Sequence, residues 1–111
     1  MEPNHIINEM VNRHITSLMS RGVHEMGLHS NTLFLINQMV LKRWVLNNYD
    51  YFTLLSPRGI NVEVTNGNEK VDIKLLSDFP GLTGDVYAII DDFGENSKEG
   101  LVITMLLPEE Y

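Results

Sequence analysis

The segment INVEVTNGNEKVDIKLL, residues 60–76, carries the clearest local structural pattern in the chain. Its Asn66-Gly67 pair is preferred in two-residue hairpin turns, and the residues on both sides alternate between apolar and polar. A turn at this pair aligns Thr65 with Asn68, Glu63 with Lys70, Val62 with Val71, and Ile60 with Ile73. Apolar residues then face each other, as do an acid and a base, so the segment predicts a β-hairpin. The face expected to be solvated consists of Asn61, Glu63, Lys70, Asp72 and Lys74.

Other strand-like segments lie on both sides of this hairpin. YFTLL (51–55) is rich in strand-forming residues, and SPRG (56–59) predicts a turn in which Pro57 presets φ. Residues 86–90 and 101–107 are apolar at both alternating positions, so each predicts a strand covered on both faces. A mostly antiparallel sheet of four to five strands follows. Helices could cover one of its faces, and a dimer could cover the other.

Before residue 50 the apolar residues recur at helical spacing instead. A first helix is predicted from about Asn4, a good cap, to Arg21, with Gly22 as a left-handed stop. A second helix is predicted over 31–48. The chain is therefore expected to be one α+β domain, with a helical half at about 4–48 and a sheet half at about 51–107. Its two N-terminal helices would pack on one face of the sheet.

The second predicted helix, NTLFLINQMVLKRWVLNN, is apolar nearly all round its axis. An ordinary surface helix has a single apolar stripe. A domain of 111 residues has little capacity to bury such a helix on every side. Either the first helix and the sheet enclose it, or a second molecule covers part of it, which predicts a homodimer or another protein partner. The expected interface residues are Phe34, Leu35, Leu41, Trp44 and Val45.

The net charge of −7 is concentrated in one half of the chain. Residues 51–111 hold eleven acidic and four basic side chains, whereas residues 1–50 hold four of each. This distribution disfavours direct binding to nucleic acid, which needs clustered Lys and Arg, and permits a basic protein partner. Plain solubility is the alternative explanation. The acidic residues expected to bind the partner are Asp85, Asp91, Asp92, Glu95 and Glu99.

HEMGLH, residues 24–29, resembles a fragment of the HExxH zinc helix. In that motif the histidines are four residues apart and reach one ion, but His24 and His29 are five apart, roughly 140° around a helix. With Gly27 between them, the segment is predicted to be a connection between helices. An alternative function uses this region in a small metal-dependent enzyme or ligand-binding protein. Its residues would be His14, His24, Glu25 and His29.

The other motifs do not indicate a cofactor or a targeting signal. DFG at 92–94 lacks the rest of the kinase signature, and 91–100 does not follow the calcium-loop pattern. The chain has no cysteine, no basic-then-apolar leader and no apolar run of about 20 residues. We therefore expect a cytoplasmic protein, with no membrane association and no metal or other cofactor.

These observations favour a small acidic, non-enzymatic protein-binding module. An inhibitor, an immunity-type protein, or a regulatory or adaptor protein of bacterial or phage origin would fit. Besides the metal-dependent enzyme or ligand binder, a second alternative is a structural subunit of a larger assembly such as a phage particle. Architecture alone does not decide among these functions.

Overall fold

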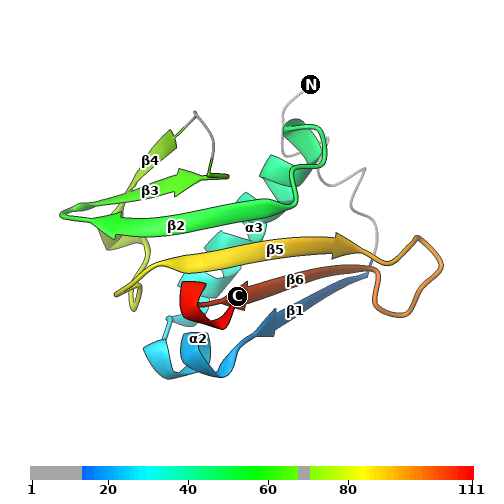
Figure 1. Ribbon diagram of the computed structural model, residues 1–111, viewed down its shortest axis with the longest axis horizontal. Helices are drawn as coiled ribbons and strands as arrows, with labels where there is room; N and C mark the ends of the chain where they lie inside the picture. Colours follow the sequence, from blue (N-terminus) through cyan, green and yellow to red (C-terminus); the bar gives the residue numbers. More distant parts are fainter. Residues whose placement is uncertain (1–13, 68–70) are drawn as a thin grey trace.

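The computed structural model describes residues 14–67 and 71–111 (Figure 1). The elements in this part of the chain are, in order, β1 (Ile15–Met19), α2 (Arg21–Met26), α3 (Ser30–Leu46), β2 (Phe52–Arg58), β3 (Asn61–Thr65), β4 (Val71–Leu75), η1 (Leu76–Asp78), β5 (Val86–Asp92), β6 (Leu101–Leu106) and η2 (Pro108–Glu110). The elements η1 and η2 are single 3-10 turns.

The described strands form one mixed sheet in the order β1-β6-β5-β2-β3-β4. Every neighbouring pair is antiparallel except β1 and β6, which run parallel. The α+β class is therefore confirmed. The expected sheet of four to five mostly antiparallel strands is wrong, because the sheet has six strands and is mixed. The helices-first order is also wrong for the described residues, since β1 precedes α2.

The largest correction concerns the first predicted helix. Residues 4–13 lie outside the described part of the chain, but Ile15–Met19 form β1. These residues pair with Leu101–Met105 of β6, so the sheet supplies hydrogen-bonding partners that a helix would otherwise supply internally. Ile15 and Thr16 are β-branched and favour a strand. Pairing with β6 therefore outweighs the helical spacing of the apolar residues in this segment.

Residues Arg21–Met26, expected in part to be a connection, form the short helix α2. Ser20 caps it by accepting a hydrogen bond from the backbone N–H of Val23 at 3.2 Å. Gly22, predicted to stop a helix, lies inside α2, where a Cβ would come within 2.4 Å of Leu107 Cδ1. The helix ends at Gly27 instead, which adopts the left-handed conformation.

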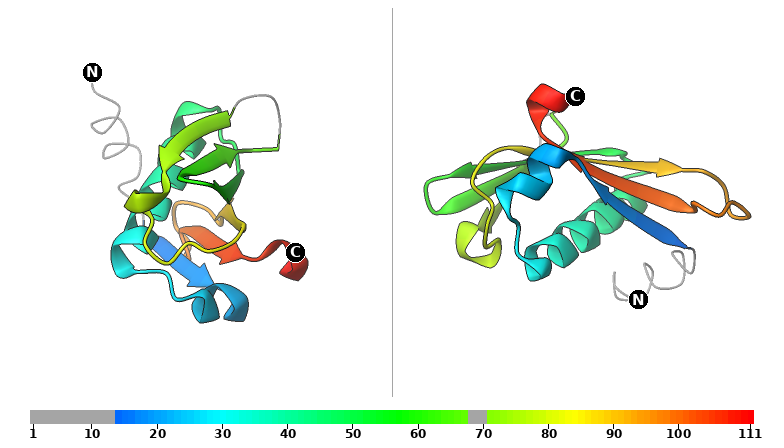
Figure 2. Two further views of the ribbon diagram at one scale, coloured as in Figure 1. Left: turned by 90° about the vertical axis from the view of Figure 1, so that its left-hand side faces the viewer. Right: turned by 90° about the horizontal axis from the view of Figure 1, so that it is seen from below.

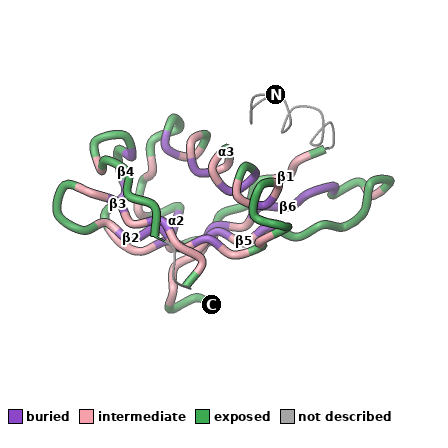
Figure 3. The backbone as a smooth tube through the Cα atoms, turned by 90° about the horizontal axis from the view of Figure 1, so that it is seen from above, coloured by how far each residue is buried: buried purple, intermediate pink, exposed green. Residues whose placement is uncertain are grey.

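Helix α3 forms as predicted and lies across one face of the sheet (Figures 1 and 2). Figure 3 shows the burial that results, with the sheet-facing side of α3 and the central strands buried. The buried side chains of α3 are Thr32, Ile36, Val40, Leu41 and Trp44. The four apolar ones share one core with inward-facing strand residues such as Leu55, Val64, Ala88, Ile90 and Met105. The chain's own sheet therefore covers most of this apolar helix.

The hairpin exists, but its register differs from the predicted one. Arg58 still belongs to β2 and pairs with Asn61, so the turn expected at 56–59 lies two residues later, at 58–61. In the β3–β4 hairpin Thr65 pairs with Val71 and not with Asn68, so the predicted two-residue turn at Asn66-Gly67 is wrong. The pairing moves by three residues, an odd number, so the side chains of β4 exchange faces.

As a result, β4 turns its charged residues towards α3 and its apolar residues outward. Val71, Ile73 and Leu75 share a face with Glu63 of β3, and all three are exposed. The expectation that Asp72 and Lys74 lie on the same solvated face as Asn61 and Glu63 is therefore wrong.

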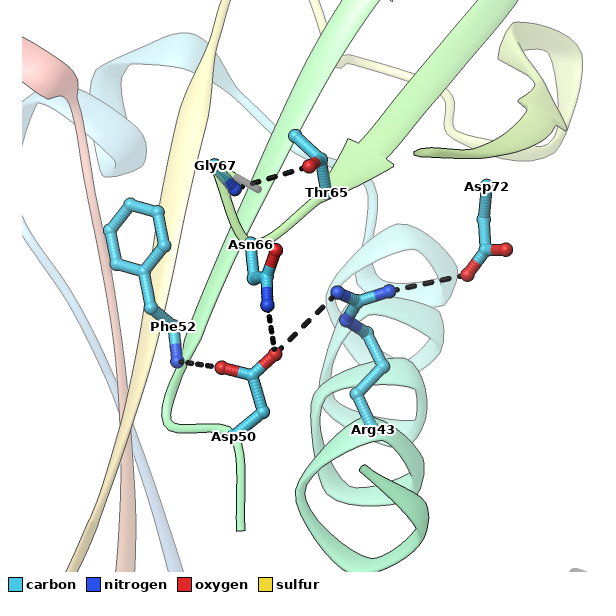
Figure 4. Close-up of polar contacts among 7 residues, drawn as sticks. All are labelled: Arg43, Asp50, Phe52, Thr65, Asn66, Gly67 and Asp72. Carbon is cyan, nitrogen blue, oxygen red and sulfur yellow. Dashed lines mark hydrogen bonds and ion pairs between the residues drawn. The ribbon is translucent and has the colours of Figure 1, made fainter. Parts of the chain in front are cut away.

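Contacts around Arg43 of α3 explain why this register is stable (Figure 4). Arg43 Nη1 donates to Asp72 Oδ2 at 3.2 Å, and Nη2 lies 3.8 Å from Asp50 Oδ2. The same Asp50 oxygen accepts a hydrogen bond from Asn66 Nδ2 at 3.0 Å. The guanidinium is largely buried, so it needs these carboxylates near it. Asp72 can reach it only if β4 turns that residue towards the helix.

Candidate functional site

The face of the sheet opposite α3, here called the outer face, is the most informative surface of the protein. In the right-hand view of Figure 2, α3 lies on one side of the sheet and the turn η2 lies on the other. Strand alternation and register assign its residues, because paired side chains point to the same face. Phe52 pairs with Ile89, Leu54 with Tyr87, and Tyr87 with Leu106, so all five point outward.

These five residues and Tyr111 form what we call the outer patch. Its five strand residues are half-buried. Phe52 and Tyr87 make an edge-to-face contact with ring centroids 4.9 Å apart, and Tyr111 lies 5.6 Å from Tyr87 in a similar arrangement. A sheet face that contacts only water normally alternates to polar residues at these positions. The outer patch therefore has the composition of a contact surface.

The carboxylate of Glu110 holds η2, the turn just before Tyr111, against the rest of the protein. It accepts hydrogen bonds from Ser20 Oγ at 2.5 Å, from the Leu107 N–H at 2.8 Å and from the Gly22 N–H at 3.1 Å. Ser20 in turn caps α2. The Ser20 hydroxyl most of all, followed by the Leu107 amide, holds the pKa of Glu110 below its ordinary value of 4.5. This contact fixes the position from which Tyr111 reaches the outer patch.

The lowered pKa of Glu110 predicts how the stability of the protein depends on acid. The ionised carboxylate is favoured in the folded state, so its contribution is complete above the unfolded value of 4.5 and is lost as the pH falls through the lower folded value. We expect the wild type to be more stable than Glu110→Gln at neutral pH, with a difference that shrinks below pH 4.5. Urea unfolding of both proteins from pH 7 to about 3 measures this difference. A difference that does not change with pH would refute the assignment.

The five acidic residues expected to bind a partner are divided between two ends of the sheet. Asp91, Asp92, Glu95 and Glu99 lie at the end of β5 and in the loop that follows it, the orange loop in Figure 1. We call this group the acidic loop. Asp85 lies before the start of β5, about 20 Å away at the rise of a strand, and pairs with Arg58 at 3.5 Å. The acidic loop adjoins the outer patch, because Asp91 follows Ile89 on the outward side of β5.

The residues expected to form a dimer interface on α3 do not share one surface. Leu41 and Trp44 are 5% and 8% exposed and belong to the protein's own core, whereas Leu35 and Val45 are half-buried against it. Phe34 alone among the five is freely accessible, at 67%.

The histidine region shows no arrangement suited to a metal. His24 is exposed on α2, while the neighbouring Glu25 pairs with Arg21 at 2.9 Å. His29 caps α3, with Nδ1 accepting a hydrogen bond from the Asn31 N–H at 3.2 Å. His14 is exposed just before β1. Within residues 14–67 and 71–111, no three His, Asp or Glu side chains gather closely enough to hold an ion.

The surface between α3 and β4 is not evident from the sequence. Two open hollows of about 330 and 220 Å³ lie there and share Met39, Lys42 and Lys74. They lie where β4 presents the charged residues Asp72 and Lys74 to the helix. Asp78 lines the first hollow and Asp72 the second, so the lysines have acidic neighbours in both.

Comparison of the chain with protein-family models, with curated proteins and with solved structures finds no match. In the described part of the chain, no helix combines the length and the apolar character needed to cross a membrane. The function is therefore inferred from the surfaces described above.

Proposed function

We propose that the chain is a small, non-enzymatic protein-binding module of the inhibitor, immunity-type, regulatory or adaptor kind, which binds its partner through the outer patch and the acidic loop. The observation that carries this proposal is the apolar character of outward positions on three neighbouring strands, β2, β5 and β6. Aromatic side chains supply much of the binding energy at protein interfaces, and the patch has three in mutual contact.

The acidic loop supports a partner whose contact surface is apolar at its centre and basic at its margin. Asp91, Asp92, Glu95 and Glu99 outnumber the single base there, Lys98, and all five are exposed. Exposed charges of this kind accelerate association and change dissociation little, so their effect depends on salt. Phe93, which is 57% exposed, offers an additional aromatic contact in the same loop. The absence of cysteine supports a reducing compartment such as the cytoplasm as the place of action.

The experiment compares baits with one apolar residue changed to glutamate on each of two surfaces. Ile89→Glu introduces a charge in the outer patch, and Phe34→Glu introduces the same charge on α3. In capture from the native host followed by binding measurements on the recovered partner, Ile89→Glu should weaken binding at least about tenfold, because a buried unpaired carboxylate is costly. Phe34→Glu should bind like the wild type. Equal binding by wild type and Ile89→Glu would exclude the outer patch.

The role of the acidic loop is tested with the same recovered partner. Glu95→Gln and Glu99→Gln together should slow association at low salt and leave dissociation nearly unchanged. The difference from wild type should disappear at high salt, where exposed charges are screened. If neither the substitutions nor the salt concentration changes the association rate, the partner's contact surface is not basic.

A further inference from the structure

A second surface, at the free edge of the sheet, is suited to a different occupant. Strand β4 ends the strand order and pairs only with β3 among the described strands. Its outward side chains are unusually apolar for an edge: Val71 is 45% exposed, Ile73 57% and Leu75 53%. Ile60, next to them in the β2–β3 turn, is 78% exposed. Monomeric proteins usually protect such an edge with charges, proline or a bulge.

The backbone of β4 also presents its hydrogen-bonding groups in a regular row. The Leu76 N–H donates to the Ile60 carbonyl at 2.9 Å, so residue 76 and, by alternation, 74 and 72 direct their backbone groups towards β3. Residues 71, 73 and 75 therefore direct theirs to the free edge. The three residues with exposed apolar side chains are the same three that can bond to a further strand.

The sequence VDIKL of β4 is complementary to itself when two copies run antiparallel about Ile73. Val71 then faces Leu75 of the second copy, and Ile73 faces Ile73, so apolar side chains meet on the outer face. Asp72 faces Lys74 on the other face. Each of the pairs centred on 71, 73 and 75 is of the type that exchanges two backbone hydrogen bonds. Opposite charges in direct opposition stabilise such a pairing.

The nearest alternative registers are unfavourable. Moving the centre to residue 72 places Asp72 against Asp72, and moving it to 74 places Lys74 against Lys74. Like charges directly opposite destabilise a strand pair. Asp72 already pairs with Arg43, but its side chain is 65% exposed, and a carboxylate can accept from both cations. One register is thus selected by both packing and charge.

We propose that two copies of this chain associate through antiparallel pairing of their β4 strands about Ile73, which joins the two sheets into one. The contact is isologous, with the same residues on both copies, so it closes at a dimer. It leaves the outer patch free, because the polar β3 residues Asn61, Glu63 and Thr65 separate the patch from β4. The dimer therefore does not depend on the proposed partner-binding function.

The test uses charge exchange across the pairing. Asp72→Lys places lysine opposite lysine, and Lys74→Asp places aspartate opposite aspartate, so each variant alone should lose dimerisation at least about tenfold. In an equimolar mixture of the two variants, every lysine faces an aspartate, and the dimer should return as a heterodimer. Analytical ultracentrifugation from about 1 to 100 µM, the range suited to a small interface, measures the mass in each case.

Two further variants distinguish dimerisation through β4 from dimerisation through another surface. Ile73→Glu should give a monomer, whereas Ile89→Glu in the outer patch should remain dimeric like the wild type. Circular dichroism of each variant distinguishes loss of pairing from loss of folding. A wild type that stays monomeric throughout the range would overturn the proposal. So would a dimer that survives Ile73→Glu, or a mixture of the two charge variants that does not associate.

Discussion

Replacing Trp44 with alanine should lower the free energy of unfolding by about 3–5 kcal/mol, the usual cost of deleting a large buried aromatic side chain. Trp44 is 8% exposed and packs between α3 and the sheet. It also makes an edge-to-face contact with Tyr49, at 4.8 Å, where the chain leaves the helix. A domain of this size is commonly stable by only about 5–15 kcal/mol, which makes the expected loss a large fraction of the total.

Phe34 provides the matched control for Trp44. Both are aromatic residues of the same helix, but Phe34 is 67% exposed, so Phe34→Ala should change the stability by less than about 0.5 kcal/mol. Urea unfolding followed by circular dichroism measures both, since the Trp44 variant lacks the only tryptophan. If Trp44→Ala were well folded and merely monomeric, Trp44 would belong to an interface between molecules.

The second large effect is expected at Gly100, where β6 begins beside the start of β1. Gly100 has φ +65°, and a Cβ there would lie 2.0 Å from the His14 carbonyl oxygen. Gly59 has nearly the same backbone angle, φ +61°, but a Cβ at that position would have no neighbouring atom within 4 Å. Alanine at either position incurs similar backbone strain, but at Gly100 it must also displace the chain before β1.

We therefore expect Gly100→Ala to cost about 1–3 kcal/mol more than Gly59→Ala, as overpacking in a closely packed region does. The local effect should be loss of the hydrogen bond from the Leu101 N–H to the His14 carbonyl, now 2.9 Å long. Denaturant unfolding gives the difference in stability, and hydrogen exchange at the Leu101 amide reports the local opening. Equal costs at the two glycines would mean that β1 adapts without difficulty.

The sequence predicts those elements in which the local pattern and the tertiary environment agree. Helix α3 is long and strongly apolar, so its existence follows from residues 31–48 alone. The interior strands β5 and β6 are likewise evident, as is the need for a cover on their second face. Residues 86–90 and 101–107 alone therefore indicate the part of the outer patch that Tyr87, Ile89 and Leu106 contribute. The contributions of Phe52, Leu54 and Tyr111 require knowledge of which strands are neighbours.

Other elements depend on contacts that the local sequence does not contain. Ile15–Met19 is compatible with a helix by spacing and becomes a strand only because β6 offers an edge. The β4 register follows from Arg43 on a different element, which attracts Asp72 to the helix side. The division of the five acids likewise reflects the length of β5, which separates Asp85 from the acidic loop.

The parallel pairing of β1 with β6 also has a consequence for how the protein folds. Ile15 pairs with Leu101, so this ladder joins segments from nearly opposite ends of the described sequence. Closing so long a loop carries a large entropic penalty, and contacts of high sequence separation slow folding. The β2–β3 and β3–β4 hairpins are local and can form early, whereas β1 must wait until β6 is in place. The edge of the sheet formed by β1 should therefore be the last part to become protected from amide hydrogen exchange during refolding.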